Sequence, residues 1–298
     1  MAIYLLKGVN SMKLRFAIAF VVCFSMITGI AIADQDALTT KIKSMSGLIA
    51  YYPLESDYKD VGPKKLHGAE VGDAKAFGWT DGVNGGKALT IDSDQFNGSF
   101  LDIPAPIGSP FDTATASCVT WVKLYPKNGW QAICERSNLW YLETENKPAE
   151  WKDNAVVWRI YDPVAVGGGG AGQMRDNANI AIKDNEWYQL GWTYDGLTMV
   201  GYVNGKKVIS KDYPDKLGPV AGTPNPPPAG KGANYNLSLG TWQQRDDWFK
   251  GAIDDFAYFS SVLTENEMMS LYETMMSASS SVTSKDKSAT LWGEIKTK

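Results

Sequence analysis

The chain has 298 residues, of which 44% are hydrophobic and 21% charged, and its formal net charge is −4. An acidic surface repels phosphate backbones, so this balance argues against nucleic acid as a partner.

Residues 1–33 have the organisation of a secretory signal peptide. The basic stretch 13–15 is followed by an uncharged apolar run that ends in Ala31-Ile32-Ala33, the small-x-small pattern that a signal peptidase cleaves. The alternative is an uncleaved membrane anchor, because the run is just long enough to span a bilayer. The small residues at the end of the run favour cleavage by a signal peptidase over retention as an anchor. We therefore expect a secreted protein, extracellular or periplasmic, that starts at or near Asp34 and has no membrane span.

The rest of the chain predicts one all-β domain over residues 47–276. Short apolar segments there are punctuated by Gly, Asn, Asp and Pro. Residues 34–46 are polar and predict a linker. One short helix is expected near the end of the domain, because Thr264 and Glu267 form a capping box ahead of an apolar stripe. Two irregular stretches read as surface loops, the glycine run 167–172 and the proline-rich segment 217–232, and the Ser-rich residues 277–298 read as a flexible tail.

Two dipeptides mark hairpin turns. Asp195-Gly196 and Asn204-Gly205 supply the positive φ angles that two-residue hairpin turns require. Two-residue turns at both places put Trp192 opposite Met199 and leave Gly201 between two bulky neighbours. One face of this three-stranded meander is therefore expected to be apolar and to pack inward.

Two cysteines follow the predicted leader, Cys118 and Cys134. Residues 126–129, Pro-Lys-Asn-Gly, predict a hairpin loop between them, and in that register Cys134 lies opposite Trp121 rather than opposite Cys118. A bulge or a one-residue change of register would bring both sulfurs to one face. Because cysteines in oxidising compartments often pair, a disulfide and two free thiols both remain open.

Five segments follow one another in a recognisable order. They are the opening strand and loop 47–68, the strand 116–123 with its Trp121, the stretches 186–196 and 202–205, and the closing segment 251–256 before the capped helix. Together they resemble the bacterial laminin G-like domains of the concanavalin A-like lectin and glucanase type. The resemblance implies an all-β fold, a two-sheet antiparallel β-sandwich of the concanavalin A-like jelly-roll type, with one short C-terminal helix. Such domains commonly bind glycans or protein partners, often with a calcium ion.

Catalysis is not expected. The glucanases of this fold carry Glu-x-Asp-x-x-Glu on one strand, which places three carboxylates on one face. That spacing is absent, and the adjacent pair Asp254-Asp255 is expected to point to opposite faces. His67 is the single histidine and lies in a predicted loop. We expect it to have a structural role in a turn. No Ser-His-Asp set and no His/Cys metal cluster can be built from this one histidine and the two cysteines.

We therefore expect a non-catalytic recognition module that binds carbohydrate or acts in adhesion. The alternative is a protein-interaction or structural subunit of an extracellular or envelope assembly, and a cryptic glycoside hydrolase is the less favoured third hypothesis. The expected partner is thus a glycan or an extracellular protein.

Aromatic residues in loops indicate where a sugar would bind. Sugar-binding modules stack exposed rings on pyranose faces and bind the hydroxyl groups with nearby amides and carboxylates. The alternative is that these rings cover the ends of the sandwich and are buried. The predicted ligand-binding residues are Trp130, Trp242, Gln243, Arg245, Asp247 and Trp248.

A structural Ca²⁺ site is predicted around Asp254. Strand alternation places its side chain on the same side as Phe256 and Tyr258, and a carboxylate carried inward needs a partner. The family resemblance suggests that the first loop, with Asp57 and Asp60, lies beside this strand. Such an oxygen-only cage suits Ca²⁺ rather than a transition metal. The alternative is that Asp254 accepts hydrogen bonds from loop amides without a metal.

Overall fold

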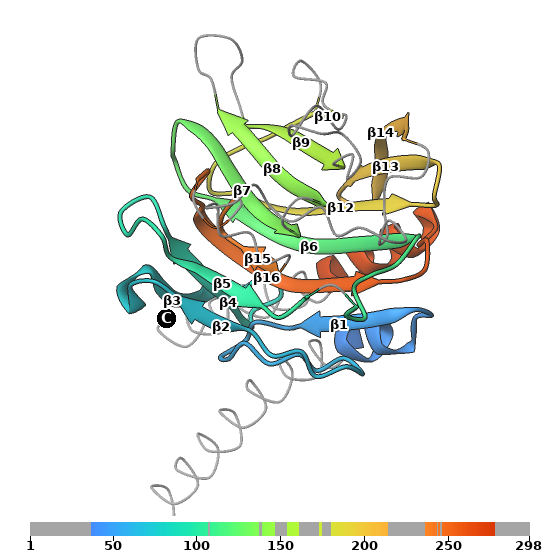
Figure 1. Cartoon of the computed structure of the whole chain (residues 1–298), viewed down its shortest axis with the longest axis horizontal. Helices are drawn as coiled ribbons and strands as arrows, with labels where there is room; N and C mark the ends of the chain where they lie inside the picture. Colours follow the sequence, from blue (N-terminus) through green and yellow to red (C-terminus); the bar gives the residue numbers. More distant parts are fainter. Residues whose placement is uncertain are drawn as a thin grey trace, which may run out of the picture.

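In the computed structural model, two antiparallel sheets lie face to face, as the sequence predicted (Figure 1). The structure describes residues 37–106, 108–136, 139–146, 154–160, 173–174, 180–213, 236–242, 244 and 246–277. The predicted leader, the glycine run, the proline-rich segment, residues 278–298 of the predicted tail, Gln243 and Arg245 lie outside the described residues.

Sheet A has the strand order β14-β13-β12-β6-β16-β4-β3, with β1 also paired to β16. Its edges are therefore β14 and β3, and β6 and β16 lie near its centre. Its strands are β1 (Leu48–Tyr52), β3 (Phe77–Asp81), β4 (Lys87–Asp92), β6 (Ala116–Leu124), β12 (Trp187–Tyr194), β13 (Thr198–Val203), β14 (Lys206–Asp212) and β16 (Lys250–Phe259).

Sheet B has the order β10-β9-β8-β7-β15-β5-β2, with β11 also paired to β9. A short 3-10 helix, η1 (Ala74–Ala76), precedes β3. The strands of sheet B are β2 (Ala69–Val71), β5 (Phe100–Ile103), β7 (Gly129–Arg136), β8 (Trp140–Asn146), β9 (Asn154–Ile160), β10 (Gln173–Met174), β11 (Ala181–Ile182) and β15 (Leu237–Leu239).

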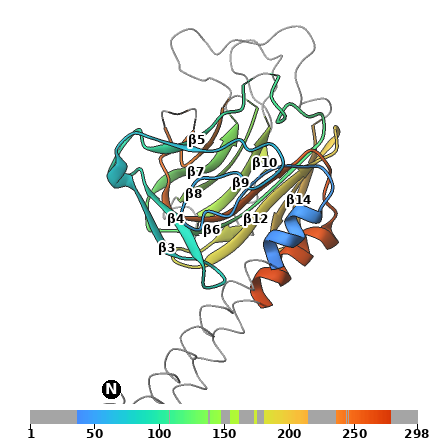
Figure 2. The same ribbon diagram turned by 90° about the horizontal axis from the view of Figure 1, so that it is seen from below.

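Two helices pack side by side on the outer face of sheet A (Figure 2). The C-terminal helix, residues 265–277, begins at the predicted capping box: Thr264 N donates to Glu267 Oε2 at 2.7 Å, and Glu267 N donates to Thr264 Oγ1 at 3.2 Å. The second helix, residues 37–44, corrects the prediction of a linker over 34–46. Leu38 and Ile42 lie one turn apart and are buried in the same apolar cluster as the C-terminal helix, so burial rather than overall polarity decides this segment. No helix among the described residues is long and apolar enough to cross a membrane.

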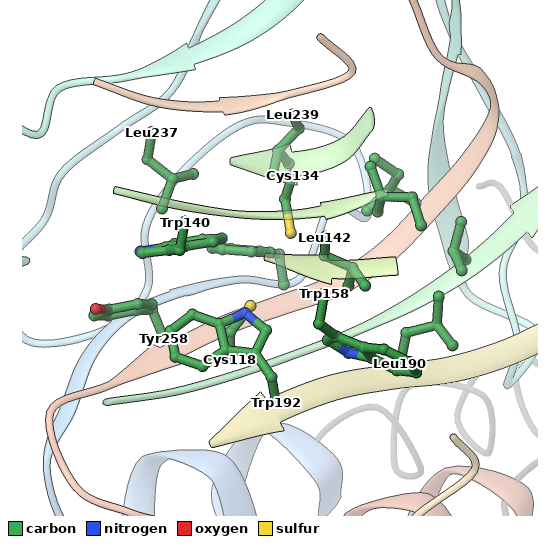
Figure 3. Close-up of a cluster of buried hydrophobic side chains, with 14 of the residues drawn as sticks. Cys118, Cys134, Trp140, Leu142, Trp158, Leu190, Trp192, Leu237, Leu239 and Tyr258 are labelled. Atoms are coloured by element: carbon green, nitrogen blue, oxygen red, sulfur yellow. The ribbon is translucent and has the colours of Figure 1, made fainter. Parts of the chain in front are cut away.

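The main core fills the space between the sheets. Trp140 of sheet B meets Trp192 of sheet A edge to face, with ring centroids 4.9 Å apart, and stacks on Tyr258 at 5.8 Å (Figure 3). Trp158 satisfies its indole nitrogen by donating to Gly191 O at 2.8 Å. The inner faces of the two sheets therefore interdigitate aromatic side chains.

The meander keeps its predicted faces but not its predicted register. Trp192 lies opposite Gly201 rather than Met199, because the first turn is centred on Gly196-Leu197 rather than on Asp195-Gly196, and Asp195 N donates to Thr198 O at 3.4 Å. The shift is two residues, so every side chain stays on the same face. The second turn is as predicted: Asn204 and Gly205 have φ angles of 51° and 76°.

The predicted hairpin between the cysteines is wrong. Strand β6 belongs to sheet A and β7 to sheet B, so the connecting residues 125–128 cross from one sheet to the other. A Pro-Lys-Asn-Gly sequence fits a turn within a sheet or a connection between sheets equally well. Only the pairing partners of the two strands distinguish the two cases.

Candidate functional site

The candidate ligand site lies where the loop between β15 and β16 folds over the outer face of sheet B. Leu101 and Ile103 of β5 point into the core, so strand alternation turns Asp102 outward. Ser238 of β15 is outward-facing for the same reason and is paired with Asp102 in the sheet register. Gln244 from the loop donates to Asp102 Oδ1 at 3.1 Å and to Ser238 Oγ at 3.5 Å.

Backbone hydrogen bonds fix the shape of this loop. Trp242 N donates to Asp246 O at 2.8 Å, and Asp246 N donates back to Trp242 O at 3.1 Å. Ala132 N donates to Asp247 O at 2.7 Å and ties the loop to β7, two residues from Trp130. The structure therefore brings Trp130, Trp242 and Asp247 into one region.

The aromatic rings of this region are partly accessible. Trp130, Trp242 and Trp248 are each half-buried, neither enclosed in the core nor fully exposed. Half-burial fixes the position of an indole while leaving part of its surface open to a ligand. This is compatible with the predicted role in sugar binding, which stays a prediction.

The charged groups here are partly withdrawn from water. Burial raises the pKa of Asp102, and a hydrogen bond from Asn236 opposes the shift. Burial lowers the pKa of Lys127, whose Nζ donates to Trp130 O at 2.8 Å, and the charges of Asp94 and Asp247 oppose that shift. Partly desolvated carboxylate and ammonium groups of this kind can accept from and donate to the hydroxyl groups of a ligand.

Sequence reasoning missed a row of glutamates on the outer face of sheet B. Leu142 of β8 points into the core, so Glu143 and Glu145 lie on the opposite face, and Glu145 is paired with Trp130. Glu135 of β7 is outward-facing on the neighbouring strand. The sequence already showed part of this row as a Glu-x-Glu pattern, which places two glutamates on one face of a strand. Glu143 and Glu145 are 2% and 0% exposed, so both carboxylates lie beneath the surface of this face.

A second aromatic group was also missed. Tyr58 stacks on Trp79 of the edge strand β3, with ring centroids 5.6 Å apart and an interplanar angle of 22°. The Tyr58 hydroxyl donates to Glu70 of β2, which is the edge strand of the other sheet. Trp79 remains 39% exposed, so this pair is a second surface where a flat ligand could stack.

The predicted orientation of Asp254 is wrong because β16 has a bulge. The pairing register of β16 with β6 shifts between Asp254 and Ala257, and Asp255 has a φ of 50°. Two residues, Asp254 and Asp255, therefore separate the inward-facing Ile253 and Phe256. Both carboxylates lie on the helix-covered side of sheet A, not on opposite faces.

The surroundings of these two carboxylates show what they contact. The Tyr51 hydroxyl donates to Asp255, and Val83 N donates to Asp254 Oδ2 at 3.0 Å. Burial, followed by the charge of Asp255, raises the pKa of Asp254 well above its usual value. The charge of Glu55 acts in the same direction.

The predicted calcium ligands are not gathered together. The Asp60 carboxylate accepts from three backbone amides, those of Tyr51, Gly62 and Leu66, at 2.7–2.9 Å. Asp57 is exposed and pairs with Lys59. Within the described ranges, no group of three Asp, Glu, His or Cys side chains could hold a metal ion. Asp254 itself accepts a hydrogen bond from the backbone amide of Val83, which agrees with the metal-free alternative for this residue. A Ca²⁺ site remains a prediction.

The single histidine takes part in the same first loop. His67 Nδ1 accepts a hydrogen bond from Asp60 N at 3.1 Å. This contact supports the predicted structural role in the turn, because the ring nitrogen satisfies a backbone donor.

Comparison with known proteins agrees with this architecture. The family model described as the concanavalin A-like lectin/glucanases superfamily matches residues 96–269. The chain belongs to this superfamily. No curated protein matches the chain significantly.

Several solved structures similar to this superfamily member are domains of larger proteins. Domain 4 of AbnA, an extracellular arabinanase from Geobacillus stearothermophilus in complex with arabinotriose, is 20% identical with a TM-score of 0.50, and the match covers 76% of this chain and 98% of that one. The binding domain of botulinum neurotoxin DC in complex with SialylT is 12% identical with a TM-score of 0.54, over 78% of this chain and 52% of that one. The same toxin domain in complex with rat synaptotagmin II is 12% identical with a TM-score of 0.53, over 77% and 52%. This chain spans about half of the toxin domains, and at these identities the likeness concerns the fold alone.

Proposed function

We propose that the chain is a secreted, non-catalytic recognition module that binds a glycan at the β15–β16 loop. The proposal rests on one observation: the same loop carries half-buried indole rings and an amide that is hydrogen-bonded to a carboxylate. Trp242 and Trp248 flank the loop, and Gln244 reaches from it to Asp102 on the outer face of sheet B. Rings supply the stacking surface, and the amide and carboxylate supply directional hydrogen bonds.

The similar structures support a binding role. The arabinanase domain is in complex with arabinotriose, and a toxin binding domain is in complex with SialylT. Both are parts of larger proteins, so a recognition role does not require catalytic residues in this domain. The buried positions of Glu143 and Glu145 agree with a module that binds without hydrolysing.

The test is a glycan array followed by titration calorimetry on the best ligand. Trp242→Ala and Trp248→Ala should each weaken binding about tenfold, because a lost stacking contact costs roughly 0.5–1.5 kcal/mol beyond the buried area. Leu197→Ala is the matched control: Leu197 is 52% exposed, and its turn lies in sheet A rather than beside the loop. The ligand should be recovered intact, without new reducing ends.

Two results would overturn the proposal. The first is an array on which the wild-type chain retains no glycan. The second is binding that neither tryptophan substitution changes while Trp79→Ala abolishes it, which would move the site to the Tyr58–Trp79 pair. Release of reducing ends by the wild-type chain but not by Glu143→Gln would favour the hydrolase hypothesis instead.

A second candidate function is the recognition of an extracellular protein. Trp79 and Val71 are both 39% exposed and lie on edge strands, β3 and β2, of the two sheets. Exposed edge strands can pair with a strand from a partner. A partner captured by the wild-type chain, lost with Trp79→Ala and not displaced by any glycan would favour this function.

A further inference from the structure

Cys118 and Cys134 meet across the core although they lie on different sheets. Cys118 is on β6, paired in the register with Trp192 and Tyr258, and Cys134 is on β7, paired with Leu142 and Leu239. Figure 3 shows their sulfur atoms pointing toward one another from opposite sheets. The two side chains are in contact, and the structure has both as free cysteines.

The surroundings of the pair control its reactivity. Both side chains are 0% exposed. Burial, followed by the contact with Cys134, raises the pKa of the Cys118 thiol well above its usual value. Burial keeps oxidants away from both sulfurs, and the raised pKa holds Cys118 in the thiol form, which is less reactive than the thiolate.

We propose that Cys118 and Cys134 form a disulfide that joins the two sheets, and that it forms only while the chain is folding in the presence of a disulfide donor. One cysteine thiolate attacks the donor disulfide, forms a mixed disulfide and releases one donor thiol. The second cysteine thiolate then attacks the protein sulfur of that mixed disulfide and releases the second donor thiol. The two protein thiols lose two protons and two electrons, and the donor disulfide is reduced to two thiols. This inference does not depend on glycan binding.

The bond would fasten the sandwich at its centre. The segment between the cysteines crosses from sheet A to sheet B, so the cross-link closes a short loop that contains the crossing. Closing a loop of about 15 residues in the unfolded chain lowers its entropy enough to shift the unfolding equilibrium by roughly 100-fold.

The experiment refolds the full chain from denaturant with either a reduced and oxidised glutathione mixture or excess dithiothreitol. A Cys23→Ser background removes the third cysteine of the sequence. Under the glutathione condition we expect a monomer without free thiols after denaturation and a peptide map that links Cys118 to Cys134. Its unfolding constant should be roughly 100-fold smaller than that of the reduced protein. Folded, reduced protein given the same glutathione mixture should react no faster than it unfolds.

The single variant Cys118→Ala is the control, since the glutathione mixture should then leave its stability unchanged. Two results would overturn the inference: free thiols at both positions after oxidative refolding to the native fold, or a linked protein that is less stable than the reduced one. Rapid oxidation of the folded protein would refute the part of the proposal that restricts the reaction to folding. None of these results bears on glycan binding by the reduced protein.

Discussion

Replacing Gly205 by alanine tests whether the second hairpin turn is packed against the C-terminal helix. Gly205 has a φ of 76°, and a Cβ built on it would lie 2.6 Å from Met269 Cα and 3.1 Å from Met269 N. An L-residue in this left-handed conformation costs roughly 1–2 kcal/mol. Overpacking against backbone adds roughly 1–3 kcal/mol, because a helix backbone cannot rotate away as a side chain can.

The chain offers a matched control in the first hairpin turn. Gly196 has a φ of 98°, and a Cβ there would meet no atom within 4 Å, so Gly196→Ala carries only the conformational cost. Urea unfolding followed by tryptophan fluorescence gives the free energy of unfolding for both variants. We expect a loss of roughly 2–5 kcal/mol for Gly205→Ala and roughly 1–2 kcal/mol for Gly196→Ala. For a domain of this size each kilocalorie lowers the Tm by roughly 2–4 °C.

Comparing the two variants separates the local cost of a positive φ from the tertiary cost of contact with the helix. Equal losses for the two variants would show that the turn is not packed against the helix at residues 265–277. No loss for Gly205→Ala would refute the positive φ as well. A Gly205→Val variant should be at least as destabilised as Gly205→Ala, because the larger side chain meets the same helix backbone.

Three further predictions concern charge, metal and processing. Because the pKa of Asp254 is raised in the folded state, that state holds more protons than the unfolded state above about pH 4, so stability should fall as pH rises and Asp254→Asn should flatten that dependence in melting curves recorded from pH 4 to 8. If Ca²⁺ is bound near Asp254 or Asp60, EDTA should lower the Tm and added Ca²⁺ should restore it; an unchanged melting curve would rule out a stabilising ion. If residues 1–33 are a signal peptide, N-terminal sequencing of exported protein should start at or near Asp34, and retention of Met1 or Met12 would contradict cleavage.

Local sequence determined the features whose physics is local. Asn204-Gly205 specifies positive φ at two consecutive residues, and the capping box at Thr264 and Glu267 satisfies backbone donors within one helical turn. Alternation of apolar and polar residues fixed which side of β12 faces the core between the sheets, and a register shift of two residues left that side unchanged. The family order of five segments was enough to predict two packed antiparallel sheets.

Tertiary structure decided the features that depend on which strands become neighbours. The same Pro-Lys-Asn-Gly sequence can close a hairpin or cross between sheets, and only the pairing of β6 and β7 with other strands made it a crossing and brought Cys118 to Cys134. The bulge at Asp255 turned both aspartates of β16 to the helix side, because one extra residue in a paired strand reverses the alternation that sequence reasoning assumes. Likewise, Gln244 and Asp102 are far apart in the chain, and their hydrogen bond exists only because the β15–β16 loop folds over the outer face of sheet B.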